Sequence, residues 1–185
     1  MIIPELIYNS TDSNVPCSMV CSLATILEFY NYPINKDELN NLFGTTFLSS
    51  AFQRWNLSAT SVNKFEVGEM TACAQYILTN IMSDMSADIV KTELSKINLS
   101  FIKRGIPVIL TGNFPFLRGN ISNSILVKGY VDKYFIVNDP RGNAYTGYID
   151  KYGENVLYSI EDIETWVAKG KAHVLRIIPK KGSIY

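Results

Sequence analysis

The stretch Asn14-Val-Pro-Cys-Ser-Met-Val-Cys-Ser-Leu-Ala-Thr-Ile-Leu-Glu-Phe-Tyr30 decides how the rest of the chain is interpreted. Apolar residues fall on nearly every side of a helix drawn over residues 18–30, and its only charge is Glu28, so the pattern predicts a buried central helix. Cys17 would then lie at the first turn of that helix, where the positive end of the helix dipole stabilises a thiolate. The alternative is that Cys17 is a small buried apolar residue that happens to lie at a helix start.

The composition predicts one globular domain over residues 1–185. The chain is 47% hydrophobic and 18% charged, which favours a packed core over disorder. Seventeen basic residues balance seventeen acidic ones and no basic stripe stands out, so nucleic acid is not an expected partner. The apolar runs are far shorter than a membrane span, and none is expected.

The cysteines and the start of the chain predict a cytoplasmic location. Three cysteines cannot all pair with one another, so we interpret them as reduced thiols. The opening Met-Ile-Ile-Pro-Glu-Leu lacks the basic flank and the cleavage site of a signal peptide. Cys17 and Cys21 share a helix face, but the chain contains one distant histidine, so no metal is expected there. No cofactor is expected either.

Periodicity and turn residues predict helices first and strands after them. The expected helices cover residues 18–30, 36–43, 67–82, 86–94 (continuing toward 102) and 159–167, with Ser86 and Ser159 as N-caps. The expected strands cover residues 106–111, 124–130, 134–138, 156–158 and 172–178. Loops are expected over 45–66, 112–123 and 141–154, with a hairpin turn at 131–133. This order predicts an α+β domain.

Three stretches of the sequence resemble the C39-like peptidases of the papain-like superfamily. Residues 17–30 are similar to the helix that carries the nucleophile, and Arg104-Gly-Ile-Pro-Val-Ile-Leu resembles the strand that opens the sheet. Ser122-Asn-Ser-Ile-Leu-Val-Lys-Gly-Tyr, followed by Phe135-Ile-Val-Asn-Asp-Pro-Arg-Gly-Asn, resembles the hairpin with the remaining catalytic groups. The resemblance implies a papain-like fold, with N-terminal helices packed on an antiparallel sheet. Its similarity to phage and bacterial members implies a phage-encoded, virion-associated protein.

The resemblance transfers the catalytic positions only in part. The nucleophile falls on Cys17 or on Ser18, and counting back from Ser22-Leu-Ala gives Ser18. The acid that orients the histidine falls on Asp139, whereas Asn123 occupies the position of the histidine itself. The glutamine of the oxyanion hole has no counterpart. The polar residues nearest its expected place are Asn9, Ser10 and Asn14.

A cysteine hydrolase needs a base near neutral pH, and asparagine cannot bind a proton in that range. Loss of one triad member costs on the order of a thousandfold in rate, and loss of an oxyanion donor about 3 kcal/mol. The chain's only histidine, His173, lies in the last expected strand, far in sequence from Asn123. An approach of its ring to the helix start is the alternative that would supply a base.

We therefore expect an inactive C39-like homologue that binds a protein or peptide partner or serves as a structural subunit. One alternative is an active cysteine peptidase or amidase that cleaves a peptide or a cell-wall crosslink with Cys17 as nucleophile. Another is acyl-group chemistry at Cys17 without a histidine.

Six tyrosines gather late in the chain, and we expect some to pack and others to line a groove or an interface. They are Tyr130, Tyr134, Tyr145, Tyr148, Tyr152 and Tyr158.

Overall fold

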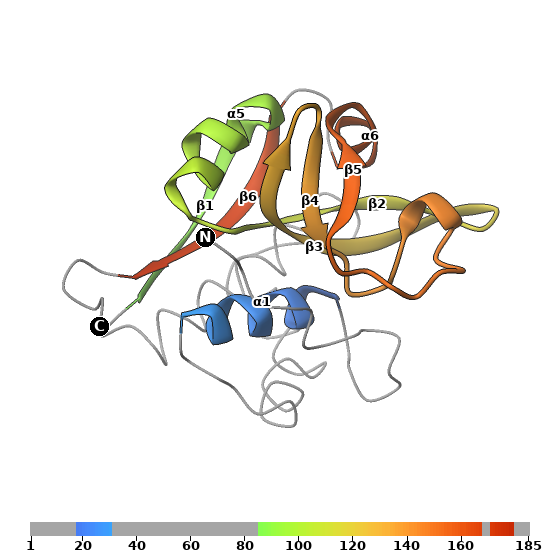
Figure 1. Ribbon diagram of the computed structural model, residues 1–185, viewed down its shortest axis with the longest axis horizontal. Coiled ribbons are helices and arrows are strands. Elements are labelled where there is room, and N and C mark those ends of the chain that lie inside the picture. The colour runs from blue at the N-terminus through green and yellow to red at the C-terminus, as the bar shows by residue number, and fades with distance from the viewer. Residues whose placement is uncertain (1–17, 31–84, 168–170, 180–185) are drawn as a thin grey trace, which may run out of the picture.

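A six-stranded antiparallel sheet forms the centre of the molecule (Figure 1). The computed structural model describes residues 18–30, 85–167 and 171–179. The strands are β1 (Met85–Glu93), β2 (Val108–Phe116), β3 (Gly119–Val131), β4 (Tyr134–Asn138), β5 (Val156–Ser159) and β6 (Lys171–Pro179). The helices are α1 (Ser18–Phe29), α5 (Leu94–Ser100) and α6 (Ile160–Trp166), with short 3-10 turns at Ile102–Arg104 (η1) and Ala144–Thr146 (η2). The strand order is β1-β6-β2-β3-β4-β5, and all neighbours are antiparallel.

Helices cover both faces of this sheet. In Figure 1, α1 lies below the sheet, and α5 and α6 lie above it. The residues of β3 from Asn123 to Val127 are consecutively buried, as expected of a central strand with cover on both sides. The observed architecture confirms the predicted α+β class, with helices packed on an antiparallel sheet.

The N-terminal helix is buried on almost every side, as its sequence predicts. Met19, Leu23, Ala24, Ile26 and Leu27 are each at most 1% exposed. The helix packs on β2 and β3. The prediction of a central helix over residues 18–30 is confirmed, and the helix begins directly after Cys17.

The predicted helix over residues 86–94 is wrong, because this segment is strand β1. It pairs residue for residue with β6, from Met85 opposite Pro179 to Glu93 opposite Lys171. The β-branched residues Ile89, Val90 and Thr92 suit a strand, and pairing with β6 supplies the backbone hydrogen bonds that a helix would have made internally. The helix begins only at Leu94, as α5.

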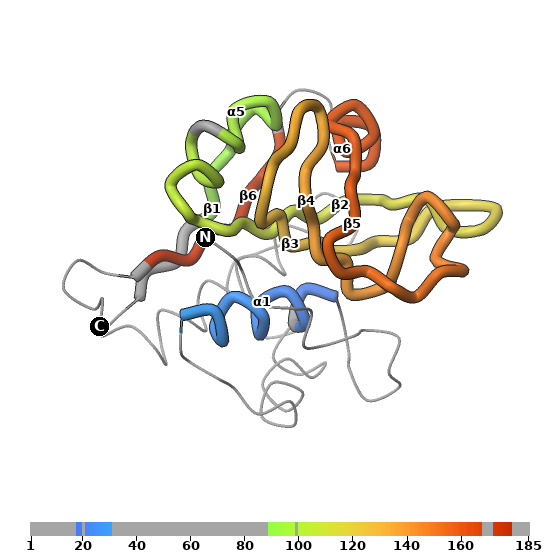
Figure 2. The backbone as a smooth tube through the Cα atoms, viewed as in Figure 1, coloured from blue at the N-terminus to red at the C-terminus, as the bar shows by residue number. Residues whose placement is uncertain are grey.

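The predicted loop over residues 112–123 is also wrong, because β2 and β3 continue as a long hairpin. Gly112 pairs with Asn123, and the pairing extends to Phe116 opposite Gly119. Figure 2 shows the end of this hairpin and the loop between β4 and β5 at the same side of the molecule. The two segments are joined by the contact of the Phe116 and Tyr148 rings, whose centroids lie 6.3 Å apart.

The remaining elements in the described ranges match their predictions closely. The strand β4 has the predicted bounds, β5 and β6 each extend by a residue or two, and residues 131–133 lie at the turn into β4. Ser159 caps α6, as predicted, with its Oγ accepting from the Asp162 amide at 3.0 Å. The helices expected over 36–43 and 67–82, and the loop over 45–66, lie outside the described residues.

Candidate functional site

Asp139 lies fully buried directly after β4. Its backbone amide donates to the Gly153 carbonyl oxygen at 2.7 Å, and the Arg141 amide donates to its Oδ1 at 3.0 Å. The loop between β4 and β5 therefore folds back onto the aspartate. A Cβ atom at Gly153 would overlap the carbonyl oxygen of Asp139, so only glycine permits this close approach.

Two tyrosines from that loop and from β5 complete the surroundings of the carboxylate. The Tyr158 hydroxyl donates to Asp139 Oδ2 at 2.8 Å and accepts from the Ala144 amide at 2.8 Å. The Tyr148 hydroxyl donates to the same Oδ2 at 3.3 Å. Both tyrosines are buried, which confirms that part of the tyrosine group packs, here around an acid.

Burial raises the pKa of Asp139 from its ordinary value of 3.8 to about 6. The hydrogen bonds from Asn123, Arg141, Tyr158 and Tyr148 lower it, but the loss of water outweighs them. Burial and the neighbouring carboxylate also raise the pKa of both tyrosine hydroxyls. At neutral pH the aspartate is therefore mostly ionised and both tyrosines stay neutral.

Asn123 lies on β3 and points its amide nitrogen at this aspartate. Its Nδ2 lies 2.8 Å from Asp139 Oδ1 and 2.8 Å from the Tyr148 hydroxyl oxygen. The amide donates to both oxygens. The ionised carboxylate can only accept, and the Tyr148 hydroxyl donates its own proton to Asp139 Oδ2. Its own Oδ1 is buried and meets no hydrogen-bond donor among the described residues. Asn123 thus makes the bond to Asp139 that the resemblance assigns to a histidine ring.

Ser18 is the first residue of α1 and is tied to the neighbour of Asn123. The Ser124 amide donates to Ser18 Oγ at 2.8 Å, and the Ser22 hydroxyl donates to the Ser124 carbonyl oxygen at 3.4 Å. These two bonds fix the start of α1 against β3. Ser18 is only 4% exposed.

The structure thus brings the predicted positions Ser18, Asn123 and Asp139 to adjoining places. Within the described ranges, no hydrogen bond joins the Ser18 hydroxyl to the Asn123 or Asp139 side chain. Asn123 cannot carry a proton between its neighbours, and Asp139 is occupied by donors on both oxygens. Among these three residues, no group therefore relays a proton from the Ser18 hydroxyl to Asp139.

The other predicted site residues lie outside the described part of the chain. These are Cys17 and the oxyanion candidates Asn9, Ser10 and Asn14. The choice between Cys17 and Ser18 as the nucleophile position therefore stays a prediction.

His173 lies on β6, opposite Lys91 of β1. Its side chain is exposed, and partial burial and the charge of Lys91 lower its pKa. In the strand order, β2 separates β6 from β3, so His173 and Asn123 are not on neighbouring strands. Two strand spacings amount to roughly 10 Å.

Sequence reasoning missed the contacts that Tyr148 and Tyr158 make with Asp139. Their position after the Asp-Pro pair is visible in the sequence, but their direction depends on the folded loop. Tyr148 has a φ of 64°, in the left-handed region that tyrosine rarely adopts. That backbone conformation turns the ring back toward β4, and no short-range pattern predicts it.

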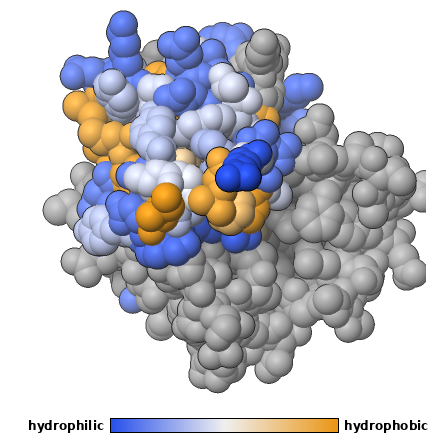
Figure 3. Space-filling view, turned by 90° about the vertical axis from the view of Figure 1, so that its right-hand side faces the viewer, coloured by the Kyte–Doolittle hydropathy of each residue, from blue (hydrophilic) through white to orange (hydrophobic). Residues whose placement is uncertain are grey.

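The side of the molecule near this loop carries separate apolar patches. Figure 3 shows them in orange with hydrophilic residues between them. Leu117 at the hairpin end and Ile149 and Tyr152 in the loop are between 65% and 75% exposed.

Within the described ranges, no three His, Cys, Asp or Glu side chains are grouped so that they could hold a metal ion. None of the helices in those ranges has the length and apolar content needed to cross a bilayer.

Comparisons with known proteins agree with the architecture. The model of the Peptidase C39-like family matches residues 8–174. A crystal structure from Bacillus anthracis that is assigned to the C39-like peptidases has a TM-score of 0.53 at 15% identity, covering 96% of this chain and 98% of that one. The peptidase domain of Streptococcus ComA, a bifunctional ABC transporter of a quorum-sensing pathway, has a TM-score of 0.50 at 13% identity, with the same coverage. At such identities the structural likeness shows the fold alone. No curated protein sequence matches this chain.

Proposed function

This chain belongs to the C39-like peptidase family, and we propose that it is a member without peptidase activity that binds a protein or peptide partner. A structural-subunit role is included in this proposal. A phage origin and a virion-associated or cytoplasmic location belong to it as well, because the late loop sequences resemble phage and bacterial members. The site residues of the proposal are Ser18 or Cys17, Asn123 and Asp139.

The observation that carries the proposal is the 2.8 Å bond from Asn123 Nδ2 to Asp139 Oδ1. A histidine in this relation to an aspartate would receive the nucleophile's proton and later deliver it to the leaving amine. The amide of asparagine makes the orienting bond but can do neither step. The arrangement keeps the hydrogen bond and lacks the acid–base function.

Burial of the same side chains supports the proposal. Ser18 is 4% exposed, and Asn123 and Asp139 are at most 1% exposed. A serine hydroxyl is a weak nucleophile unless a base activates it. Here its oxygen accepts from the Ser124 amide, and no hydrogen bond joins the hydroxyl to a base among the described residues. Hydrolysis through Ser18 is therefore not expected.

Incubation of the protein with a mixed peptide library, followed by mass spectrometry, tests the proposal. We expect no cleavage above that of a Cys17→Ala variant. Iodoacetamide should alkylate Cys17 with a pH profile close to the ordinary thiol pKa of roughly 8.5. Cleavage that disappears in Cys17→Ala, together with fast alkylation well below that pH, would instead establish the active cysteine peptidase or amidase.

A further inference from the structure

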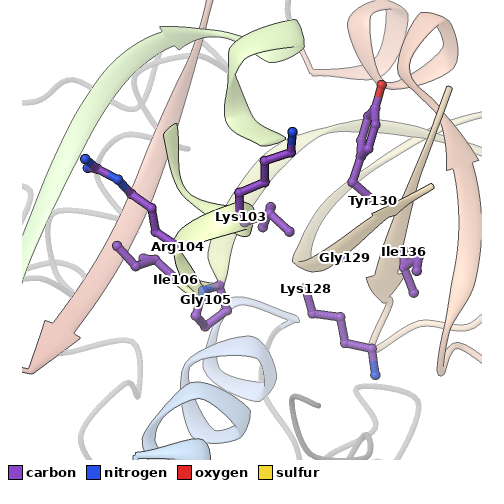
Figure 4. A pocket seen from close by; sticks show the side chains of 10 residues that line it. Lys103, Arg104, Gly105, Ile106, Lys128, Gly129, Tyr130 and Ile136 are labelled. Carbon is purple, nitrogen blue, oxygen red and sulfur yellow. The ribbon is translucent and has the colours of Figure 1, made fainter. Parts of the chain in front are cut away.

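A pocket of about 470 Å³ lies at the other end of β3, away from Asn123 (Figure 4). One wall is the turn from η1 into β2, and the other is formed by β3 and β4 where they enter their hairpin. Lys128 is five positions after Asn123 on the strand, which corresponds to roughly 17 Å. The volume is within the range of pockets that hold small ligands or peptide side chains, about 300–1,000 Å³.

The first wall is a rigid turn that displays two positive charges. Gly105, with a φ of 72°, donates its amide to the Ile102 carbonyl oxygen at 2.9 Å, and the Ile106 amide donates to the Phe101 carbonyl oxygen at 3.1 Å. These bonds fix the backbone from which Lys103 and Arg104 extend. Both side chains are exposed, and neither makes an ion pair with any residue of the described ranges.

The second wall contains a β-bulge that sets the direction of a third cation. The β3–β4 register shifts between Val127 and Gly129, so Lys128 is the extra residue. A Cβ atom at Gly129 would lie 2.9 Å from Ile136 Cδ1, so the absence of a side chain lets Ile136 pack close to the strand. The bulge therefore places a lysine beside an apolar surface.

Among the described residues, the lining combines three cations with apolar side chains and includes no carboxylate. In Figure 4, Lys103 and Tyr130 point the same way from opposite walls, Arg104 points to the side, and Lys128 points away from them. The charged ends surround the pocket and do not converge on one point. Such an arrangement suits several negative charges spread along a ligand better than one compact anion.

We propose that this pocket binds an acidic segment of a protein partner, with an apolar side chain of that segment placed between its carboxylates. Lys103 and Arg104 would face the carboxylates, and Ile106, Ile136 and the Tyr130 ring would contact the apolar side chain. The inference rests on the proposed function, since it names the chemistry of the partner. The preformed turn and bulge lower the ordering cost that such binding has to overcome.

The test measures binding of a short fluorescein-labelled peptide of alternating glutamate, leucine and glycine by fluorescence anisotropy. We expect saturable binding that Lys103→Glu/Arg104→Glu weakens at least about tenfold. The matched control is Arg118→Glu/Lys151→Glu, which changes the net charge equally at exposed residues away from the pocket and should leave binding within about twofold. Replacing glutamate by glutamine, or leucine by serine, in the peptide should each weaken binding. The full chain is used, and mass spectrometry of the same samples reports cleavage.

Equal loss of binding in both double variants would overturn the inference, because it would indicate general charge attraction. Competition by inorganic phosphate at the peptide's own concentration would overturn it in favour of a compact-anion site. Tighter binding of a single-stranded oligonucleotide than of the peptide would overturn it in favour of nucleic acid. If the peptide is neither bound nor cleaved, the inference is refuted and the proposed function is unaffected. If the peptide is cleaved, the proposed function is refuted.

Discussion

The polar side chains at the two ends of β3 differ in burial and in hydrogen bonding. Around Asn123, an ionised aspartate and two tyrosines are buried and bonded to one another. Around Lys128, charged side chains surround an open pocket, and Lys103 and Arg104 have no acidic partner in the described ranges. The difference indicates that the hydrogen bonds at the first end stabilise the protein itself, whereas Lys103 and Arg104 at the second end are available to bind another molecule.

If that comparison is right, substitutions at the Asn123 end should act on stability and those at the Lys128 end on binding. The largest effect is expected from Gly153→Ala, because the new Cβ would overlap the Asp139 carbonyl oxygen. We expect a loss of more than about 3 kcal/mol in the free energy of unfolding, or failure to fold. Urea unfolding measures it. Gly119→Ala is the control, since nothing lies within 4 Å of a Cβ there, and a similar loss in that variant would contradict the explanation.

The buried carboxyl predicts an unusual pH dependence. The pKa of Asp139 is about 6 in the folded protein and 3.8 ordinarily, so between these values the folded state holds a proton that the unfolded state releases. The free energy of unfolding should therefore fall as pH rises through this window, by on the order of 3 kcal/mol from this group. Asp139→Asn should remove that slope, because asparagine does not titrate in this range. The tyrosine hydroxyls can turn to accept from the new amide. Unfolding curves for both proteins from pH 3.5 to pH 7 would reveal an unchanged slope if the aspartate is not responsible.

Removal of the Tyr158 hydroxyl should cost less than these backbone and charge effects. Tyr158→Phe leaves Asp139 Oδ2 with the longer bond from Tyr148 and leaves the Ala144 amide without its acceptor. A loss of about 1–3 kcal/mol is expected for such buried groups. Tyr134→Phe changes an exposed ring and should alter stability by less than about 0.5 kcal/mol. Urea unfolding of both variants measures the difference. Equal losses in Tyr158→Phe and Tyr134→Phe would contradict a stabilising bond from Tyr158 to Asp139.

The same sequence features explain which parts of the fold were predictable. Residues of α1 and α6 carry their own signals, a nearly continuous apolar surface in one and the Ser159 cap in the other. The β3–β4 hairpin is marked by apolar strands around a short turn. By contrast, β1 is a strand only because β6, more than 75 residues later in the chain, pairs with it. The extension of β2 past Gly112 likewise depends on pairing with β3.

The sequence was enough to identify the residues of the candidate site, but their contacts could not be predicted from it. The resemblance to the C39-like peptidases pointed to Asn123 and Asp139, and the structure places Asn123 Nδ2 2.8 Å from Asp139 Oδ1. The Ser18 bond to the Ser124 amide required the packing of α1 on β3, which local sequence does not encode. The pocket at Lys128 was missed altogether, because a bulge and a left-handed glycine on another segment create it.

A smaller effect should separate the two serines that join α1 to β3. Ser18→Ala removes the acceptor of a buried amide at 2.8 Å, with an expected loss of about 1–2 kcal/mol. Ser22→Ala removes a longer bond, at 3.4 Å, to a carbonyl oxygen and should cost less than about 1 kcal/mol. Thermal unfolding of both variants provides the measurement, and the reverse order would contradict the geometry.

The smallest change in stability is expected at the Lys128 end. Lys103→Glu/Arg104→Glu alters exposed side chains without ion pairs in the described ranges and should change the free energy of unfolding by less than about 0.5 kcal/mol. Urea unfolding of this variant beside Tyr158→Phe compares the two ends of β3 directly. A loss as large as that of Tyr158→Phe would mean that the cations support the fold.

The absence of a proton carrier between Ser18 and Asp139 is most directly tested by restoring one. The measurement is peptide-library turnover by Ser18→Cys/Asn123→His, made in a Cys17→Ala background so that one thiol remains at the helix start. We predict turnover about a hundredfold or more above the wild type and above either single change, because general acid–base catalysis contributes about 10²–10⁴ in rate. Equal turnover by the wild type would contradict the account, as would a correctly folded restored variant that stays at background.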